Sequence, residues 1–218
     1  MNSLIYDGKE IPINTKGLFK VINYKEDTRL DLHQWANFSS RKKPISFIVI
    51  HHGGLSPHHL AKVFSTSERK VSSHLGIGLD KNGEVYVAQY LDLKHKAWHA
   101  GVGNEGSIGI DICFQPGVEW NKEYGVKTIS NPSPRGPKLI NDIPDIILEA
   151  LYAFLEALEA ALLGGHGLRP ASERDAVYEL SELTKFNVVG HHHITENKWD
   201  IAWCWDRLVA RRSRRNVC

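Results

Sequence analysis

Histidines follow two apolar runs of the 218-residue sequence, which contains 12 histidines in all. His51 and His52 come directly after the run ISFIVI, and His191, His192 and His193 come directly after FNVVG. Histidine is the commonest metal ligand in proteins, and its side chain also titrates near neutral pH. The two segments therefore indicate a metal site or acid–base chemistry.

A carboxylate, Asp200, lies nine residues beyond His191. Two histidines and one carboxylate leave the fourth position of a tetrahedral zinc ion open for water, which is typical of a catalytic rather than a structural site. The spacing also fits a polar loop that follows a strand. Cys204 is a rival third ligand because thiolates bind zinc well. For the second ligand, His192 and His193 are alternatives to His191.

The elements that must position these residues mix strands and helices. Apolar, β-branched runs such as ISFIVI are typical of strands buried on both faces. Ser56 and Pro57 predict the N-cap and first residue of a helix, and Lys81-Asn82-Gly83 predicts a hairpin turn. Strands are expected at 45–50, 74–80, 84–90, 107–114 and 186–190, and helices at 28–38, 56–65, 145–163, 171–184 and from 202 onwards. The fold class is α/β, a single domain with a central mixed β-sheet flanked by helices.

The chain length favours one elaborated domain. We expect an N-terminal extension at 1–43, the main domain at 44–210 and a basic C-terminal tail at 211–218. Within the domain, residues 115–142 are rich in proline and glycine and predict a long loop. Loops of this length in compact domains are usually functional or mobile.

Composition excludes several classes of protein. The 27 basic and 25 acidic residues nearly balance, and no basic sheet or recognition helix is evident, which disfavours nucleic-acid binding. The three cysteines are too few for a disulfide framework and favour a reducing compartment. We see no signal peptide and no transmembrane segment. The expected location at synthesis is the cytoplasm, and a protein acting on the cell wall would need a separate factor to release it.

Five ordered segments carry a family resemblance. They are VSSHLGIGLDKNGEVYVAQ (71–89), AWHAG (97–101), SIGID (107–111), VVGH (188–191) and KWD (198–200). The sequence resembles the zinc-dependent N-acetylmuramoyl-L-alanine amidases of the type-2 amidase and peptidoglycan-recognition superfamily, in particular muropeptide-recycling amidases and phage endolysins. The resemblance extends over about residues 45–205.

This resemblance implies a type-2 amidase fold, one zinc ion, and hydrolysis of the amide between N-acetylmuramic acid and L-alanine in peptidoglycan or muropeptides. His51, His191 and Asp200 match the zinc ligands of the family. Asp111 matches a catalytic carboxylate, usually glutamate, and Lys198 matches a lysine that stabilises the transition state. The residues expected along the substrate groove are His52, His74, Trp98 and His99, of which His74 is also a structural hydrogen-bonding group.

General chemistry supports these roles. Zinc lowers the pKa of bound water from 15.7 towards about 7 and polarises the amide carbonyl. A carboxylate such as Asp111 can take the proton of that water and return it to the leaving amine. A fixed ammonium such as that of Lys198 can stabilise the charge that develops on the tetrahedral oxygen.

The sequence also departs from the family pattern. His193 stands where the family usually has aspartate, Glu196-Asn197 replaces Pro-Gly, and Ile201 replaces the proline after the third ligand. Two alternatives therefore accompany the amidase assignment: a non-catalytic peptidoglycan-binding module, and another zinc amidohydrolase or peptidase on the same fold. Silent relatives typically lose a metal ligand, whereas this chain retains a candidate for each.

Overall fold

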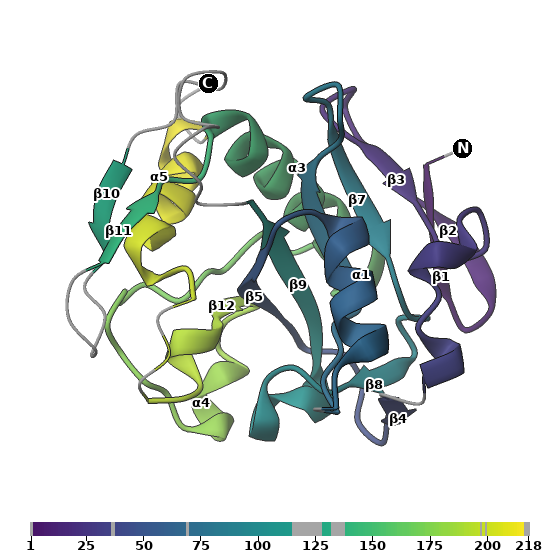
Figure 1. Ribbon diagram of the computed structural model, residues 1–218. Coiled ribbons are helices and arrows are strands. Elements are labelled where there is room, and N and C mark those ends of the chain that lie inside the picture. Colours follow the sequence, from purple (N-terminus) through teal and green to yellow (C-terminus); the bar gives the residue numbers. More distant parts are fainter. Residues whose placement is uncertain are drawn as a thin grey trace.

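The computed structural model describes residues 2–35, 38–68, 70–114, 128–131, 138–196, 198 and 200–215. Six strands within these ranges form the central sheet in the order β12-β5-β9-β6-β7-β3 (Figure 1). Within this sheet β6 pairs with β7 in an antiparallel manner and the other four pairings are parallel, so the sheet is mixed. The expected α/β class is confirmed. The strand bounds are β3 (Lys20–Ile22), β5 (Phe47–Gly54), β6 (Leu75–Leu79), β7 (Val85–Gln89), β9 (Ser107–Cys113) and β12 (Val188–Gly190).

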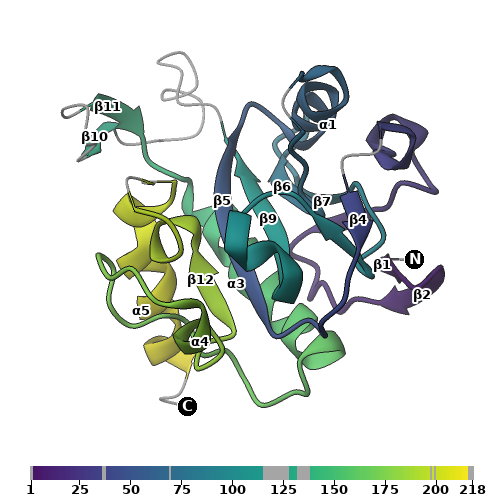
Figure 2. The ribbon, with the colours of Figure 1, turned by 90° about the horizontal axis from the view of Figure 1, so that it is seen from below.

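Two helices cover opposite faces of the sheet (Figure 2). The shorter helix, α1 (Pro57–Thr66), begins as predicted, because the Ser56 hydroxyl accepts a hydrogen bond from the backbone N–H of His59. The longer helix, α3 (Asp145–Leu162), buries an apolar stripe with three- and four-residue spacing against the other face. We call the side of the sheet under α1 the α1 face and the other side the α3 face.

Strand alternation determines which side chains reach each face. His51 of β5 stands opposite Asp111 of β9, and both lie on the α1 face, together with Cys113, which packs in the apolar cluster of α1. His52 stands opposite Ile112, and these two residues lie on the α3 face. Adjacent histidines therefore have different environments.

Smaller elements surround the sheet. Three antiparallel hairpins or ribbons are formed by β1 (Ser3–Tyr6) with β2 (Lys9–Pro12), β4 (Phe38–Ser40) with β8 (His95–Ala97), and β10 (Thr128–Asn131) with β11 (Lys138–Asn141). Among the described residues, the other helices are α4 (Leu180–Leu183) and α5 (Trp205–Arg215). Short 3₁₀ turns occupy Thr28–Leu30, His33–Trp35, Gly101–Gly106, His191–His193 and Ala202–Cys204. Among the described helices, none is long and apolar enough to cross a bilayer.

Two predicted helices are largely wrong. Within 28–38, the described residues form two 3₁₀ turns at Thr28–Leu30 and His33–Trp35, and Phe38 begins β4. The Leu32 N–H donates to the carbonyl of Tyr90, which holds this segment beside the end of β7. Of 171–184, only α4 is helical. The Ala171 N–H donates to Val188 O and the Tyr178 N–H donates to His193 O, so tertiary hydrogen bonds outweigh local helix propensity.

The predicted extension at 1–43 contributes to the main body of the fold. Its strand β3 pairs in parallel with β7, and its residues Leu4, Phe19 and Val21 belong to the main apolar core. The predicted loop at 115–142 contains β10 and β11, and its residues 115–127 and 132–137 lie outside the described residues. In the predicted tail, α5 continues to Arg215, and 216–218 lie outside the described residues.

Candidate metal centre

Three ligand-type side chains converge at one point. His51 Nδ1 lies 3.1 Å from His191 Nδ1 and 3.3 Å from Asp200 Oδ2, and His191 Nδ1 lies 2.9 Å from the same carboxylate oxygen. One ligand atom from each residue lies within 4.8 Å of the others. The residues expected as metal ligands are thus brought together.

Strand pairing explains why two histidines 140 residues apart meet. β12 pairs in parallel with β5, and Gly190 stands opposite Ile50. His51 and His191 are the next residues along each strand, so the two imidazoles leave neighbouring backbones. Asp200 reaches them from the connection between the 3₁₀ turns at 191–193 and 202–204.

The donor set fits a zinc ion. Ligand atoms placed tetrahedrally at 2.0–2.1 Å from zinc would lie about 3.3 Å from one another. The separations of 2.9–3.3 Å among His51, His191 and Asp200 are close to this value. Two ring nitrogens and a carboxylate oxygen that face a common point are a set of lone pairs suited to a divalent cation.

The electrostatics favour an ionised third ligand. Burial by itself raises the pKa of Asp200, but the neighbouring imidazoles of His191 and His51 outweigh burial and hold it far below its usual range. Asp200 is therefore a carboxylate at neutral pH. His51 and His191 are buried, with exposed fractions of 5% and 8%.

A second carboxylate, Asp111, lies on the same face of the sheet as His51. The two residues are register partners on neighbouring parallel strands. Burial raises the pKa of Asp111, and the nearby His51 opposes that effect. A Cβ atom at Gly53 would lie 2.6 Å from Asp111 Cβ, so the carboxylate fits against β5 only because residue 53 has no side chain.

The two histidines after His191 are directed elsewhere. His193 Nδ1 accepts a hydrogen bond from the Gly190 N–H, and its Nε2 lies 3.0 Å from the carbonyl of Glu173. Burial lowers the pKa of His193 to about 3. His192 packs against His193 with ring centroids 3.9 Å apart and the rings tilted by 44°, and burial lowers the pKa of His192 to about 4. Of the three, His191 faces His51.

Cys204, the rival ligand, is 1% exposed and donates from Sγ to the carbonyl of Ile201 at 3.3 Å. Burial raises the pKa of its thiol to about 12, which disfavours the thiolate that a metal requires. Within the described residues, the metal-type cluster contains Asp200 and not Cys204.

The residues expected along the groove separate into different environments. His99 contacts the centre, with Nδ1 at 2.9 Å from His51 Nε2. His74 is fully buried behind His99, with ring centroids 5.7 Å apart. Trp98 is half-buried and donates its backbone N–H to Ser72 Oγ. His52, on the α3 face, lies 3.1 Å from the carbonyl of Phe114 and packs edge-on against Trp203.

Lys198 occupies the connection that carries Asp200, two residues before it, and its side chain is exposed. Its role in catalysis stays a prediction.

A residue that the sequence did not single out, Arg41, organises the surroundings of the centre. Its guanidinium donates to the carbonyls of His95, Glu105 and Ser107 at 2.7–2.8 Å. These carbonyls come from β8, the following 3₁₀ turn and the start of β9. In the sequence Arg41 is part of the basic stretch Arg41-Lys42-Lys43, and only the fold distinguishes the half-buried arginine from its exposed neighbours.

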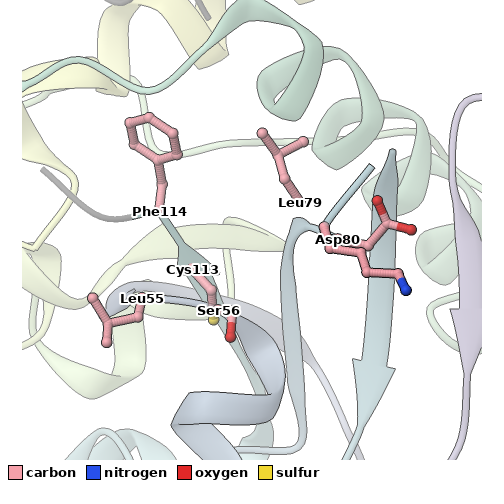
Figure 3. A pocket seen from close by; sticks show the side chains of 7 residues that line it. Leu55, Ser56, Leu79, Asp80, Cys113 and Phe114 are labelled. Carbon is pink, nitrogen blue, oxygen red and sulfur yellow. The ribbon is translucent and has the colours of Figure 1, made fainter. Parts of the chain in front are cut away.

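A separate pocket of about 230 Å³ opens at the carboxyl ends of β5, β6 and β9 (Figure 3). Its lining includes Leu55, Ser56, Leu79, Asp80, Lys81, Cys113 and Phe114. Cys113 follows Asp111 by two residues on β9, so the pocket lies further along the same strands than the metal-type cluster.

The fold and the site define a class of protein, and comparisons with known proteins agree. The family model of N-acetylmuramoyl-L-alanine amidases matches residues 41–202. The chain belongs to this family, the type-2 amidase superfamily that the sequence resembles. A comparison with curated proteins gives no match.

Solved structures share the fold at low sequence identity. AmpDh3 from Pseudomonas aeruginosa, solved with an anhydromuramic pentapeptide, is 18% identical with a TM-score of 0.50, over 83% of this chain and 64% of that one. The PlyG catalytic domain is 14% identical with a TM-score of 0.48, over 91% and 96% of the two chains. Drosophila peptidoglycan recognition protein SD is 20% identical with a TM-score of 0.44, over 79% and 83%. At these identities the likeness concerns the fold.

Proposed function

We propose that the protein is a zinc-dependent N-acetylmuramoyl-L-alanine amidase, which hydrolyses the amide between the lactyl group of N-acetylmuramic acid and L-alanine. The observation that carries this proposal is the convergence of His51, His191 and Asp200, with a second buried carboxylate on the same face of the sheet. Family membership supports the same reaction class.

His51, His191 and Asp200 would hold the zinc ion. When bound, zinc supplies Lewis acidity, which lowers the pKa of a water molecule towards about 7 and polarises a carbonyl. The chain supplies a largely buried and preformed donor set, because β5 carries His51 and the end of β12 places His191 beside it. Ligands mounted on strands keep their directions better than ligands on loops.

Asp111 is the proposed general base and acid. Its buried carboxylate has a raised pKa, so it holds a proton more readily than an exposed aspartate does. It would accept a proton from the attacking water and then donate it to the nitrogen of the leaving L-alanine. This transfer balances the reaction, since the amine leaves neutral and the acyl carbon gains a hydroxyl group.

Lys198 is the proposed electrophilic partner. Its exposed ammonium precedes Asp200 by two residues, so substrate bound at the cluster would lie near it. A positive charge there would stabilise the oxyanion of the tetrahedral intermediate, and such stabilising groups are typically worth about 10²–10³ in rate.

The test is to incubate zinc-loaded protein with intact sacculi and with soluble muropeptides, and to identify the products by mass. An amidase releases stem peptides that begin with L-alanine. Release from sacculi indicates a bacteriolytic enzyme of the endolysin type, and release from soluble muropeptides alone indicates recycling. Binding without release from either substrate would contradict the proposal and favour a peptidoglycan-binding module.

A further inference from the structure

We propose that His99 is a positioning residue, which determines the ring nitrogen of His51 that is left free for a metal ion. The part of this inference that concerns a metal ion rests on the proposed function. Its structural content is a directed chain of hydrogen bonds that can be measured in the metal-free protein.

The chain of hydrogen bonds runs from the His51 side chain to a backbone carbonyl. His51 Nε2 lies 2.9 Å from His99 Nδ1, and His99 Nε2 lies 3.3 Å from Ser107 Oγ. The Ser107 hydroxyl donates to the carbonyl of Gly103 at 2.7 Å. The imidazoles of His51 and His99 meet edge to face, with an interplanar angle of 86°.

The carbonyl at the end sets the direction of every bond. A carbonyl only accepts, so the Ser107 hydrogen is committed to Gly103 and Ser107 Oγ accepts from His99 Nε2–H. A neutral imidazole carries one ring N–H, which makes His99 Nδ1 an acceptor. His51 must then donate from Nε2. Its Nδ1 retains a lone pair, and this atom faces His191 and Asp200.

His99 is itself fixed in place. The backbone N–H groups of His99 and Ala100 donate to Asn104 Oδ1 at 3.0 and 2.6 Å. Its ring lies against Gly109 of β9, where a Cβ atom would be 2.8 Å from both Cγ and Nδ1 of the imidazole. The Gly109 N–H donates to His74 Nδ1 at 3.0 Å, which fixes the strand at this contact. The imidazole therefore has little freedom to move.

Two substitutions distinguish the contact that His99 Nδ1 makes with His51 from the contact that His99 Nε2 makes with Ser107. In His99→Asn, the side-chain oxygen can occupy the position of Nδ1 and still accept from His51. In His99→Gln, the amide reaches the position of Nε2 and keeps the contact with Ser107 but not the contact with His51. Loss of such an outer partner typically weakens metal binding by about 10–100-fold.

The first experiment measures zinc affinity by competition with a chelator. We expect His99→Asn to bind zinc within a few-fold of the natural protein and His99→Gln to bind about 10–100-fold more weakly. Gly109→Ala, which keeps every hydrogen-bonding side chain but displaces the ring, should resemble His99→Gln. Thermal unfolding of the metal-free variants checks that each is folded. Equal affinities, or equal losses in the Asn and Gln variants, would overturn the inference.

The second experiment reads the tautomer directly and needs no variant at position 99. Nitrogen-15 NMR of the metal-free protein, with the His51 signals assigned through His51→Gln, should show the proton on Nε2 and a bare Nδ1. A proton on Nδ1 would overturn the inference. If the natural protein binds no zinc while His51 shows the expected tautomer, the proposed function fails and the directed chain stands.

Discussion

His51 and Asp111 stand opposite each other on the neighbouring parallel strands β5 and β9, and both side chains lie on the α1 face. One of them belongs to the metal-type cluster and the other does not. The pKa values of the two carboxylates of the site are shifted in opposite directions. The neighbouring imidazoles lower the pKa of Asp200 in spite of its burial, and burial raises the pKa of Asp111. Paired groups whose pKa values diverge in this way are typical of divided roles, here an ionised ligand and a proton carrier.

Replacing Asp200 by alanine should abolish stoichiometric zinc binding, because it removes the anionic member of the cluster. The loss should exceed the roughly 10–100-fold that removal of an outer partner costs. Metal content after dialysis, measured by atomic emission, checks this. Cys204→Ala is the matched control, since the buried thiol donates to Ile201 and should leave zinc content unchanged. Zinc loss in the cysteine variant alone would show that the third ligand is Cys204.

Asp111→Asn should retain zinc and lose activity. An amide of the same shape cannot accept the proton of the attacking water, and general acid–base catalysis typically contributes about 10²–10⁴ in rate. The measurement is kcat on a soluble muropeptide with metal content determined on the same sample. Asp111→Glu, which keeps a carboxylate, should retain more activity than Asp111→Asn. An asparagine variant with the natural kcat would exclude Asp111 as the proton carrier.

The free energy of unfolding should fall as the pH drops from about 6.5 towards 3. Burial, assisted by Arg41, lowers the pKa of His74 to about 3, whereas an unfolded histidine has a pKa near 6.5. Within this window the unfolded chain takes up a proton at His74 that the folded chain does not. Stability is therefore lost at up to about 1.4 kcal/mol per pH unit from this residue.

Urea titrations between pH 4 and 6, roughly the centre of that window, test the effect of His74. His74→Asn can still accept from the Gly109 N–H and does not titrate, so its stability should depend less steeply on pH than that of the natural protein. Parallel slopes for the two proteins would mean that His74 does not supply this dependence.

Arg41→Lys should destabilise the fold by at least about 2 kcal/mol. The planar guanidinium donates to three carbonyls at 2.7–2.8 Å, and a single ammonium cannot reproduce that geometry. Lys43→Ala removes an exposed charge two residues away and should change stability by less than about 0.5 kcal/mol. Denaturant unfolding of the two variants compares them, and similar midpoints would contradict the structural role of Arg41.

Much of the fold could be predicted because its strands are apolar runs with clear ends. The run ISFIVI became β5, and the hairpin turn at Lys81-Asn82-Gly83 joins β6 to β7 as expected. The helix at 145–163 was predicted to within one residue from its apolar spacing. The failures at 28–38 and 171–184 are segments whose backbone groups bond to distant strands. Such partners are invisible in a local pattern.

The candidate site also has features that the local sequence predicts and features that only the fold reveals. His51 and His191 were singled out because each follows a buried strand, and parallel pairing brings those strand positions together. The different surroundings of His51 and His52 depend on which face of β5 each occupies, which requires the sheet to be known. The contact from His99 to Ser107 and the carbonyl partners of Arg41 depend on how the 3₁₀ turn at 101–106 folds, and nothing in the spacing of the sequence reveals them.

The most direct test of the central claim is hydrolysis of a soluble N-acetylmuramoyl peptide in oxygen-18-labelled water. Mass spectrometry should find the label in the lactyl carboxylate of the sugar product and a free amino group on L-alanine. The reaction should stop on chelation and resume when zinc is restored. Zinc-loaded protein that binds this substrate and leaves the lactyl amide intact would contradict the account.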